Sequence, residues 1–264
     1  MTQDAPFLTR NTHRSFDTQV DRYDQYAVVQ HLSARRLADV MRGYQSEIDG
    51  LTIIEMGAGT GLVTKHLLEL FPESDVIATD LSSNMIQALG ENLSRYDQLM
   101  CLTHDANESH LLMPSAHVAV SAFTLQWLDD PVDSVVKWAG SMCRPSWLFL
   151  SWPGEGSFAE WRQMAEHSGL SFTGNLLPPG SIVDEIASRV SAQVRYHSVE
   201  SIELTYPRAI DFFRSIRDIG AGSERASATG PRNLLRLSRV WDRLAGGEVV
   251  STYQVHTAVL YISD

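Results

Sequence analysis

One stretch, residues 51–61, constrains the fold more than any other part of the chain. It reads Leu-Thr-Ile-Ile-Glu-Met-Gly-Ala-Gly-Thr-Gly. Its apolar start predicts a buried strand, Glu55 follows at the carboxyl end of that strand, and a helical pattern begins at Leu62. Glycines between a strand and a helix allow a sharp turn and let a ligand approach the main chain. Because the N–H groups of the helix point at the same place, the stretch predicts a nucleotide-type pocket.

Apolar runs and helical patterns alternate along the rest of the chain. Strands separated by helices predict an α/β fold with a mostly parallel sheet covered on both faces. Two helices joined by a Gly/Ser-rich segment are expected at 207–244, with Pro231 at the start of the second. The expected strands are 51–56, 75–79, 99–103, 116–123, 147–152, 199–206 and 249–262. The other expected helices are 14–41 (one short and one longer, before Gly43), 62–70, one capped by Ser82 and running to 89, 131–142, one capped by Ser157, and 181–189.

Composition and charge exclude several classes of protein. The net charge of −11 argues against nucleic-acid binding. No apolar run approaches the roughly 20 residues that cross a bilayer, and the first residues show no signal-peptide pattern. Cys101 and Cys143 fit no metal or redox spacing. We therefore expect a cytoplasmic protein with no metal, no nucleic-acid partner and no membrane segment.

Residues 207–243 depart from this acidity, with eight arginines against four acidic residues. The spacing of Arg232, Arg236, Arg239 and Arg243 puts all four on one face of a helix. Such a face suits an acidic partner. The alternative is an ordinary solvated helix surface.

Three acidic residues narrow the choice of ligand. Asp80 ends the second strand, 21 residues after Gly59, where a carboxylate can accept both ribose hydroxyls. Asp105, followed by Ala106, comes after the third strand, where it could read an adenine edge. Glu55 at the glycine turn would repel a pyrophosphate but suits an ammonium and a sulfonium. This favours S-adenosylmethionine over a nicotinamide dinucleotide, which stays an alternative.

At these positions the chain resembles the class I S-adenosylmethionine-dependent methyltransferases, through Glu55-Met-Gly-Ala-Gly-Thr-Gly61, Asp80-Leu-Ser-Ser-Asn-Met85 and Asp105-Ala106. The resemblance implies a Rossmann-like, seven-stranded sheet whose last strand is antiparallel. It implies glycines along the methionine part of the cofactor, Asp80 at the ribose, and Met85 and Asp105 at the adenine, with simple core packing as the alternative for Met85. The full implied cofactor set is Glu55, Gly57, Ala58, Gly59, Gly61, Asp80, Leu81, Met85, Asp105, Ala106 and Ser121.

A narrower resemblance, over nearly the whole chain, is to the malonyl-[acyl-carrier protein] O-methyltransferases of biotin synthesis. It rests on Phe16 with 23–27, and on 121–127, 177–179, 213–221 and 251–253, whereas Arg144-Pro-Ser-Trp replaces a turn that is usually Gly-rich. It implies esterification of the malonyl carboxylate on an acyl carrier protein. The open alternatives are a methyltransferase for another small acid or a quinone, and an assembly factor of the same fold without this activity.

Transfer to a carboxylate needs no general base, because the group is already ionised at neutral pH. We predict that Arg214 grips the malonyl carboxylate, with a surface ion pair to Asp211 or Asp218 as the alternative. The predicted catalytic residues are Tyr23, Gln126, Trp127 and Arg214. Core packing is the alternative for Tyr23, Trp127 and Tyr253. The predicted substrate and carrier contacts are Arg217, Arg225, Arg232, Arg236, Arg239, Arg243 and Tyr253.

The expected organisation is one methyltransferase domain over 1–264. Residues 1–45 would form an N-terminal helical cap, 46–170 the cofactor-binding core, and 171–264 a substrate-side region containing the inserted helices.

Overall fold

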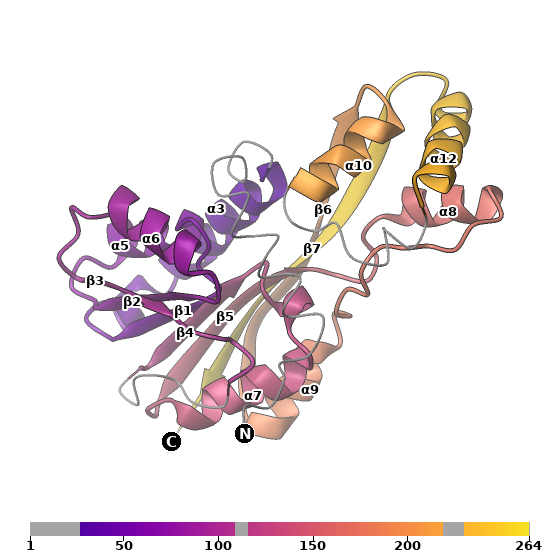
Figure 1. Cartoon of the computed structure of the whole chain (residues 1–264). Helices are drawn as coiled ribbons and strands as arrows, with labels where there is room; N and C mark the ends of the chain where they lie inside the picture. The colour runs from indigo at the N-terminus through magenta and orange to yellow at the C-terminus, as the bar shows by residue number, and fades with distance from the viewer. Residues whose placement is uncertain (1–26, 109–115, 219–229, 264) are drawn as a thin grey trace, which may run out of the picture.

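The computed structural model describes residues 27–108, 116–218 and 230–263. Its centre is a seven-stranded sheet with the order β3-β2-β1-β4-β5-β7-β6 (Figure 1). β1 to β5 pair in parallel, and β7 runs antiparallel to both of its neighbours, β5 and β6. The predicted sheet with its antiparallel last strand is confirmed. The strands are β1 (Ile53–Met56), β2 (Val76–Asp80), β3 (Leu99–Thr103), β4 (Val118–Ala122), β5 (Ser146–Pro153), β6 (Gln193–Tyr206) and β7 (Val249–Ile262).

Helices cover both faces of this sheet, as expected for parallel strands (Figure 1). α3, α5 and α6 pack on one face around Leu37, Leu67 and Leu89. α7 and α9 pack on the other around Val135 and Ile186. The helices are α3 (Val28–Arg42), α4 (Gln45–Ile48), α5 (Leu62–Leu70), α6 (Ser83–Asn92), the 3-10 helix η1 (Leu125–Trp127), α7 (Pro131–Ser141), α8 (Ala159–His167), α9 (Ile182–Val190), α10 (Ala209–Asp218) and α12 (Gly230–Ala245).

Local sequence signals set several of these boundaries. The Ser82 hydroxyl accepts the Met85 N–H at 3.2 Å and caps α6 as predicted. Pro131 begins α7, directly after the capping residue Asp130. The predicted cap at Ser157 is wrong. Phe158 is the residue before α8, and the Ser157 hydroxyl instead accepts the Gln254 N–H from β7.

The last two strands extend past the rest of the sheet. β5 pairs with β7 only from Val255 onward, so residues 249–254 of β7 pair with β6 alone. β6 begins at Gln193 rather than at 199, because residues 193–198 also pair with β7. α10 and α12, the helices inserted between β6 and β7, cover this extension together with α8 (Figure 1). The helical insertion is confirmed.

A largely aromatic core lies beneath the inserted helices, and we call it the insertion cluster. Phe212 is at its centre, with its ring centroid 5.3 Å from Trp241 of α12 and 6.0 Å from Phe158. The cluster also reaches Val29 of α3. Its buried members are Val29, Phe158, Trp161, Leu177, Ala209, Phe212, Phe213, Ile216, Leu237, Trp241, Val249, Tyr253 and Val255. None of the helices in the described ranges is long and apolar enough to cross a membrane.

Candidate functional site

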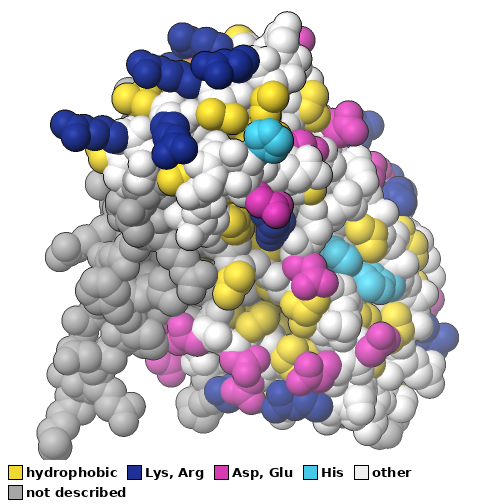
Figure 2. Space-filling view, turned by 90° about the vertical axis from the view of Figure 1, so that its right-hand side faces the viewer, with side chains coloured by type: hydrophobic (Ala, Val, Ile, Leu, Met, Phe, Trp, Pro, Cys, Tyr) yellow, Lys and Arg dark blue, Asp and Glu magenta, His cyan; other side chains and the backbone are white. Residues whose placement is uncertain are grey.

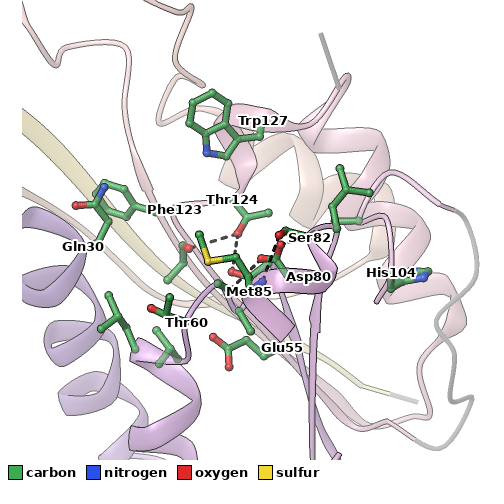
Figure 3. A pocket seen from close by; sticks show the side chains of 18 of the residues that line it. Gln30, Glu55, Thr60, Asp80, Ser82, Met85, His104, Phe123, Thr124 and Trp127 are labelled. Carbon is green, nitrogen blue, oxygen red and sulfur yellow. Dashed lines mark hydrogen bonds between the residues drawn. The ribbon is translucent and has the colours of Figure 1, made fainter. Parts of the chain in front are cut away.

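A cavity opens at the carboxyl ends of β1, β2 and β4, which is the edge where parallel α/β sheets bind ligands (Figure 3). Helix α3 contributes one wall through Gln30 and Ala34. The lining residues are Gln30, Ala34, Glu55, Gly57, Ala58, Gly59, Thr60, Leu62, Val63, Asp80, Leu81, Ser82, Met85, His104, Asp105, Ala106, Asn107, Ala122, Phe123, Thr124, Trp127 and Leu128.

The glycine turn between β1 and α5 forms the floor of the cavity. Gly57, Gly59 and Gly61 all have positive φ, at 75°, 56° and 96°, a conformation that glycine adopts without strain. Gly57 is also sterically required, because a Cβ there would lie 2.1 Å from Oγ1 of Thr124. That hydroxyl donates to the Met56 carbonyl at 3.1 Å. The turn is therefore held against the loop that follows β4.

Asp80 joins the glycine turn to the end of β2. One of its carboxylate oxygens, Oδ2, accepts the Gly59 N–H at 2.9 Å, and the other, Oδ1, accepts the Ser82 N–H at 2.9 Å. These bonds fix the carboxylate at the cavity wall. Asp80 is among the residues that line the cavity.

Glu55 is a buried acid at the base of the cavity, with 2% of its surface exposed. Burial raises the pKa of its carboxyl from 4.5 to about 7, the hydrogen bond from Thr64 at 2.6 Å opposes the rise, and nearby Asp80 adds to it. An ionised Glu55 is therefore costly until a cation lies beside it.

The far end of the cavity is built from α6 and the loop after β3. Met85 is buried and lines the wall. Oδ1 of Asp105 accepts the Asn107 N–H at 2.9 Å, which shapes the loop. The Trp138 indole donates to the Ala106 carbonyl at 2.9 Å and holds that residue at the cavity. Met85, Asp105 and Ala106 thus line this end of the cavity.

Phe123, Thr124 and Trp127 close the opposite side (Figure 3). Phe123 has a φ of 57°, a left-handed conformation that costs a non-glycine residue about 1–2 kcal/mol. The predicted Trp127 lies in the lining. The predicted Gln126 is not in the lining, since its Nε2 donates to the Phe123 carbonyl at 2.7 Å. Gln126 therefore holds the backbone of Phe123, which does line the cavity.

Sequence reasoning missed Gln30, Phe123, Thr124 and His104 as cavity residues. A signal for Gln30 was present, because it lies three residues after Ala27 and four before Ala34, both of which are buried. That spacing puts its side chain beside the buried stripe of α3. Thr124 and Phe123 had no comparable signal, since their roles depend on a left-handed residue that no periodicity reveals.

The predicted Gly61 is not in the cavity lining, because its Cα faces Leu89 and Leu93. Two further predicted residues lie away from the cavity because the sheet and its core enclose them. Ser121 is fully buried and donates to the Met56 carbonyl at 3.0 Å, so it braces β1 against β4. Tyr253 is buried in the insertion cluster, 4.7 Å from the Phe158 ring. Both placements favour core packing over contact with a ligand. Tyr23 and Arg225 lie outside the described residues.

The structure does not bring Arg214 to the cavity lining. Its side chain is exposed on α10 and pairs with Asp211 at 3.0 Å, which is the alternative weighed from the sequence. Arg217 is also exposed on α10. Arg232, Arg236, Arg239 and Arg243 are exposed on α12, where the spacing placed them on one face. Basic side chains gather at the top of the face shown in Figure 2, over the inserted helices.

Charge in the cavity is one-sided. Its described lining holds the carboxylates of Glu55, Asp80 and Asp105 and no lysine or arginine. No group of three or more metal-ligating side chains occurs among the described residues. A ligand with positive charge suits this lining, whereas a pyrophosphate would be repelled.

Comparisons with known proteins agree with this geometry. A methyltransferase-domain family model matches residues 54–146. The malonyl-[acyl-carrier protein] O-methyltransferase of Bacillus cytotoxicus is 29% identical over 243 residues, covering 88% of this chain and 84% of the relative. The enzyme of that name from Halorhodospira halophila is 25% identical, with 96% and 88% covered.

Solved structures share the fold. YcgJ from Bacillus subtilis superposes with a TM-score of 0.60 at 11% identity, covering 87% of this chain and 99% of that one. Phosphoethanolamine N-methyltransferase 2 of Haemonchus contortus, solved with S-adenosyl-L-methionine, gives a TM-score of 0.61 at 14% identity, with 100% and 62% covered. On these findings the chain is an S-adenosylmethionine-dependent methyltransferase with the Rossmann-like fold, and it resembles the malonyl-[acyl-carrier protein] O-methyltransferases.

Proposed function

We propose that this enzyme transfers the methyl group of S-adenosylmethionine to the free carboxylate of malonyl-acyl carrier protein, an early step of biotin synthesis. The observation that carries the choice of acceptor is similarity over nearly the full length to relatives of that name, at 29% identity over 88% of the chain. The similarity to the Halorhodospira halophila relative covers 96% of the chain, so it includes the inserted helices, which lie outside the matched domain model ending at residue 146.

The cavity supports S-adenosylmethionine as the bound methyl donor. The ammonium and sulfonium of the cofactor match a lining of carboxylates without lysine or arginine among its described residues. In this arrangement Glu55 and the glycine turn face the methionine part, and Asp80 accepts the ribose hydroxyls. Met85 and Asp105 hold the adenine at the far end.

The acceptor side favours a substrate that is already ionised. The described lining residues there, Phe123, Thr124 and Trp127, carry no group that titrates near neutral pH. His104 lies at the opposite end of the cavity in Figure 3. A carboxylate needs no proton removed: its oxygen forms the new bond to the methyl carbon while the carbon–sulfur bond breaks and its electron pair stays on sulfur. The protein's contribution is alignment and the exclusion of water.

The arginine face of α12 supports an acidic carrier as the partner. Arg232, Arg236, Arg239 and Arg243 are exposed together, and no ion pair within the described residues neutralises them. Because the whole enzyme has a charge of −11, docking of an acidic carrier needs such a local positive surface. α10 packs against α12 through the Phe212–Trp241 contact. We therefore assign Arg214 and Arg217 of α10 to carrier docking.

Charge reversal tests the docking face. Exchanging Arg236 and Arg239 for Glu should weaken carrier binding on the order of tenfold or more and reduce its dependence on salt. The matched control is Arg95→Glu, an exposed arginine beyond the end of α6. Surface plasmon resonance against the malonyl carrier at two salt concentrations gives the measurement. A carrier affinity that changes neither with salt concentration nor with the two substitutions would refute the assignment of this face to carrier docking.

Labelled S-adenosylmethionine tests the reaction itself. Label should pass to malonyl carrier but not to acetyl carrier, which lacks the free carboxylate. Transfer to a quinone or another small acid, with the malonyl carrier untouched, would favour a different methyltransferase. Cofactor binding without transfer to any acceptor would favour an assembly factor of the same fold.

A further inference from the structure

Phe123 is held in its left-handed conformation from both sides. Its N–H donates to the Ser151 carbonyl of β5 at 2.8 Å, and its own carbonyl accepts Nε2 of Gln126 at 2.7 Å. The next residue, Thr124, is bonded to the Met56 carbonyl beneath the glycine turn. Strained backbone persists where the surroundings fix it, and it concentrates at functional sites. These hydrogen bonds therefore fix the position of the Phe123 backbone at the cavity.

That ring lies between two parts of the molecule. Phe123 lines the cavity and also packs against the insertion cluster beneath α8, α10 and α12. Gln30 of α3 lines the same cavity (Figure 3). A group that comes from the inserted helices toward the glycine turn therefore meets the Phe123 ring.

We propose that Phe123 determines acceptor specificity by limiting the width of the group that can reach the transferable methyl. An unbranched acyl carboxylate passes the ring, whereas a branched or aromatic one does not. The proposal rests on the proposed function for the acceptor class, although the steric limit set by the Phe123 ring can be tested through the methyl donor alone.

The first test needs no acceptor. Calorimetry compares the binding of S-adenosylmethionine with that of its S-benzyl sulfonium analogue, in which a benzyl group replaces the methyl. Phe123→Gly removes the ring, and glycine adopts the positive φ without strain. Phe123→Leu replaces the ring with a smaller apolar side chain. Relative to the wild type, the Gly variant should raise the ratio of benzyl-analogue affinity to S-adenosylmethionine affinity on the order of tenfold or more, with the Leu variant between.

Phe158→Gly is the matched control. Phe158 also has a positive φ, at 63°, and belongs to the insertion cluster, but it does not line the cavity. It should leave the ratio of the two affinities unchanged. An equal ratio in wild type and both Phe123 variants, with normal S-adenosylmethionine binding, would overturn the proposal.

The second test uses acceptors. Methyl transfer to methylmalonyl carrier, relative to malonyl carrier, should rise on the order of tenfold in Phe123→Gly and stay constant in Phe158→Gly. If the wild type methylates neither carrier while the benzyl analogue still distinguishes the variants, the malonyl assignment is wrong and the steric limit at Phe123 is supported. If the malonyl carrier is methylated but neither the affinity ratio nor the transfer ratio changes, the steric limit at Phe123 is refuted and the malonyl assignment is supported.

Discussion

Glu55 gives the sharpest prediction, because it is an acid buried at the base of the cavity. Its pKa is raised by burial to about 7, above its ordinary value of 4.5. The folded state therefore binds more protons than the unfolded chain between these values, and its stability falls as the pH rises through that window. Glu55→Gln keeps the shape and removes the titration, so the variant should lack this component of the pH dependence.

The magnitude follows from the pKa difference. With about 1.4 kcal/mol for each pKa unit, the wild type should lose about 2 to 3 kcal/mol more than the Gln variant between about pH 5 and pH 8. For a chain of this size that equals a relative shift in melting temperature of about 5–10 °C. Thermal unfolding without ligand, at both pH values, measures it. Parallel pH profiles of the wild type and Glu55→Gln would refute the reasoning.

Cofactor binding should show the same linkage with the opposite sign. An ammonium beside Glu55 favours its ionised form, so binding below neutral pH releases a proton. If the carboxyl returns to its ordinary pKa of 4.5, affinity should rise about 50- to 100-fold from pH 5 to pH 8. Calorimetry in two buffers with different ionisation enthalpies counts the protons. Proton uptake, or equal release by Glu55→Gln, would contradict the assignment.

Two further substitutions test the cavity floor. Asp80→Asn should weaken S-adenosylmethionine binding about 10- to 100-fold by calorimetry, because it removes charge-assisted hydrogen bonds; the exposed Asp75→Asn should not, and equal effects of the two would contradict the role. Gly57→Ala should lower the melting temperature by more than Gly59→Ala, because its Cβ would lie 2.1 Å from Thr124 whereas nothing lies within 4 Å at Gly59. The reverse order would show that the turn is not held as described.

The sequence predicted most of the fold because its signals are local. Alternating apolar runs gave β3 and β7 with their observed bounds, and the Ser82 cap and Pro131 marked two helix starts. The glycine turn and Asp80 were placed at one edge because the carboxyl ends of parallel strands meet there, whereas Met85 was placed there by the resemblance to methyltransferases.

The acceptor side of the cavity was harder to predict from the sequence, because its geometry depends on contacts between residues that are distant in the chain. The left-handed Phe123 is set by bonds to Ser151 and Gln126, and no spacing encodes it. Arg214 was selected for its chemistry alone, and the amphipathic pattern of α10 buries Phe212 and Phe213 while leaving that arginine at the surface with Asp211.

The central claim is methyl transfer from S-adenosylmethionine to the malonyl carboxylate on a carrier protein. Intact-mass spectrometry of malonyl carrier after incubation with the enzyme and cofactor tests it most directly. The malonyl chain should gain one methyl group, removable by mild alkali. An unchanged mass, with the cofactor bound and the carrier docked, would contradict it.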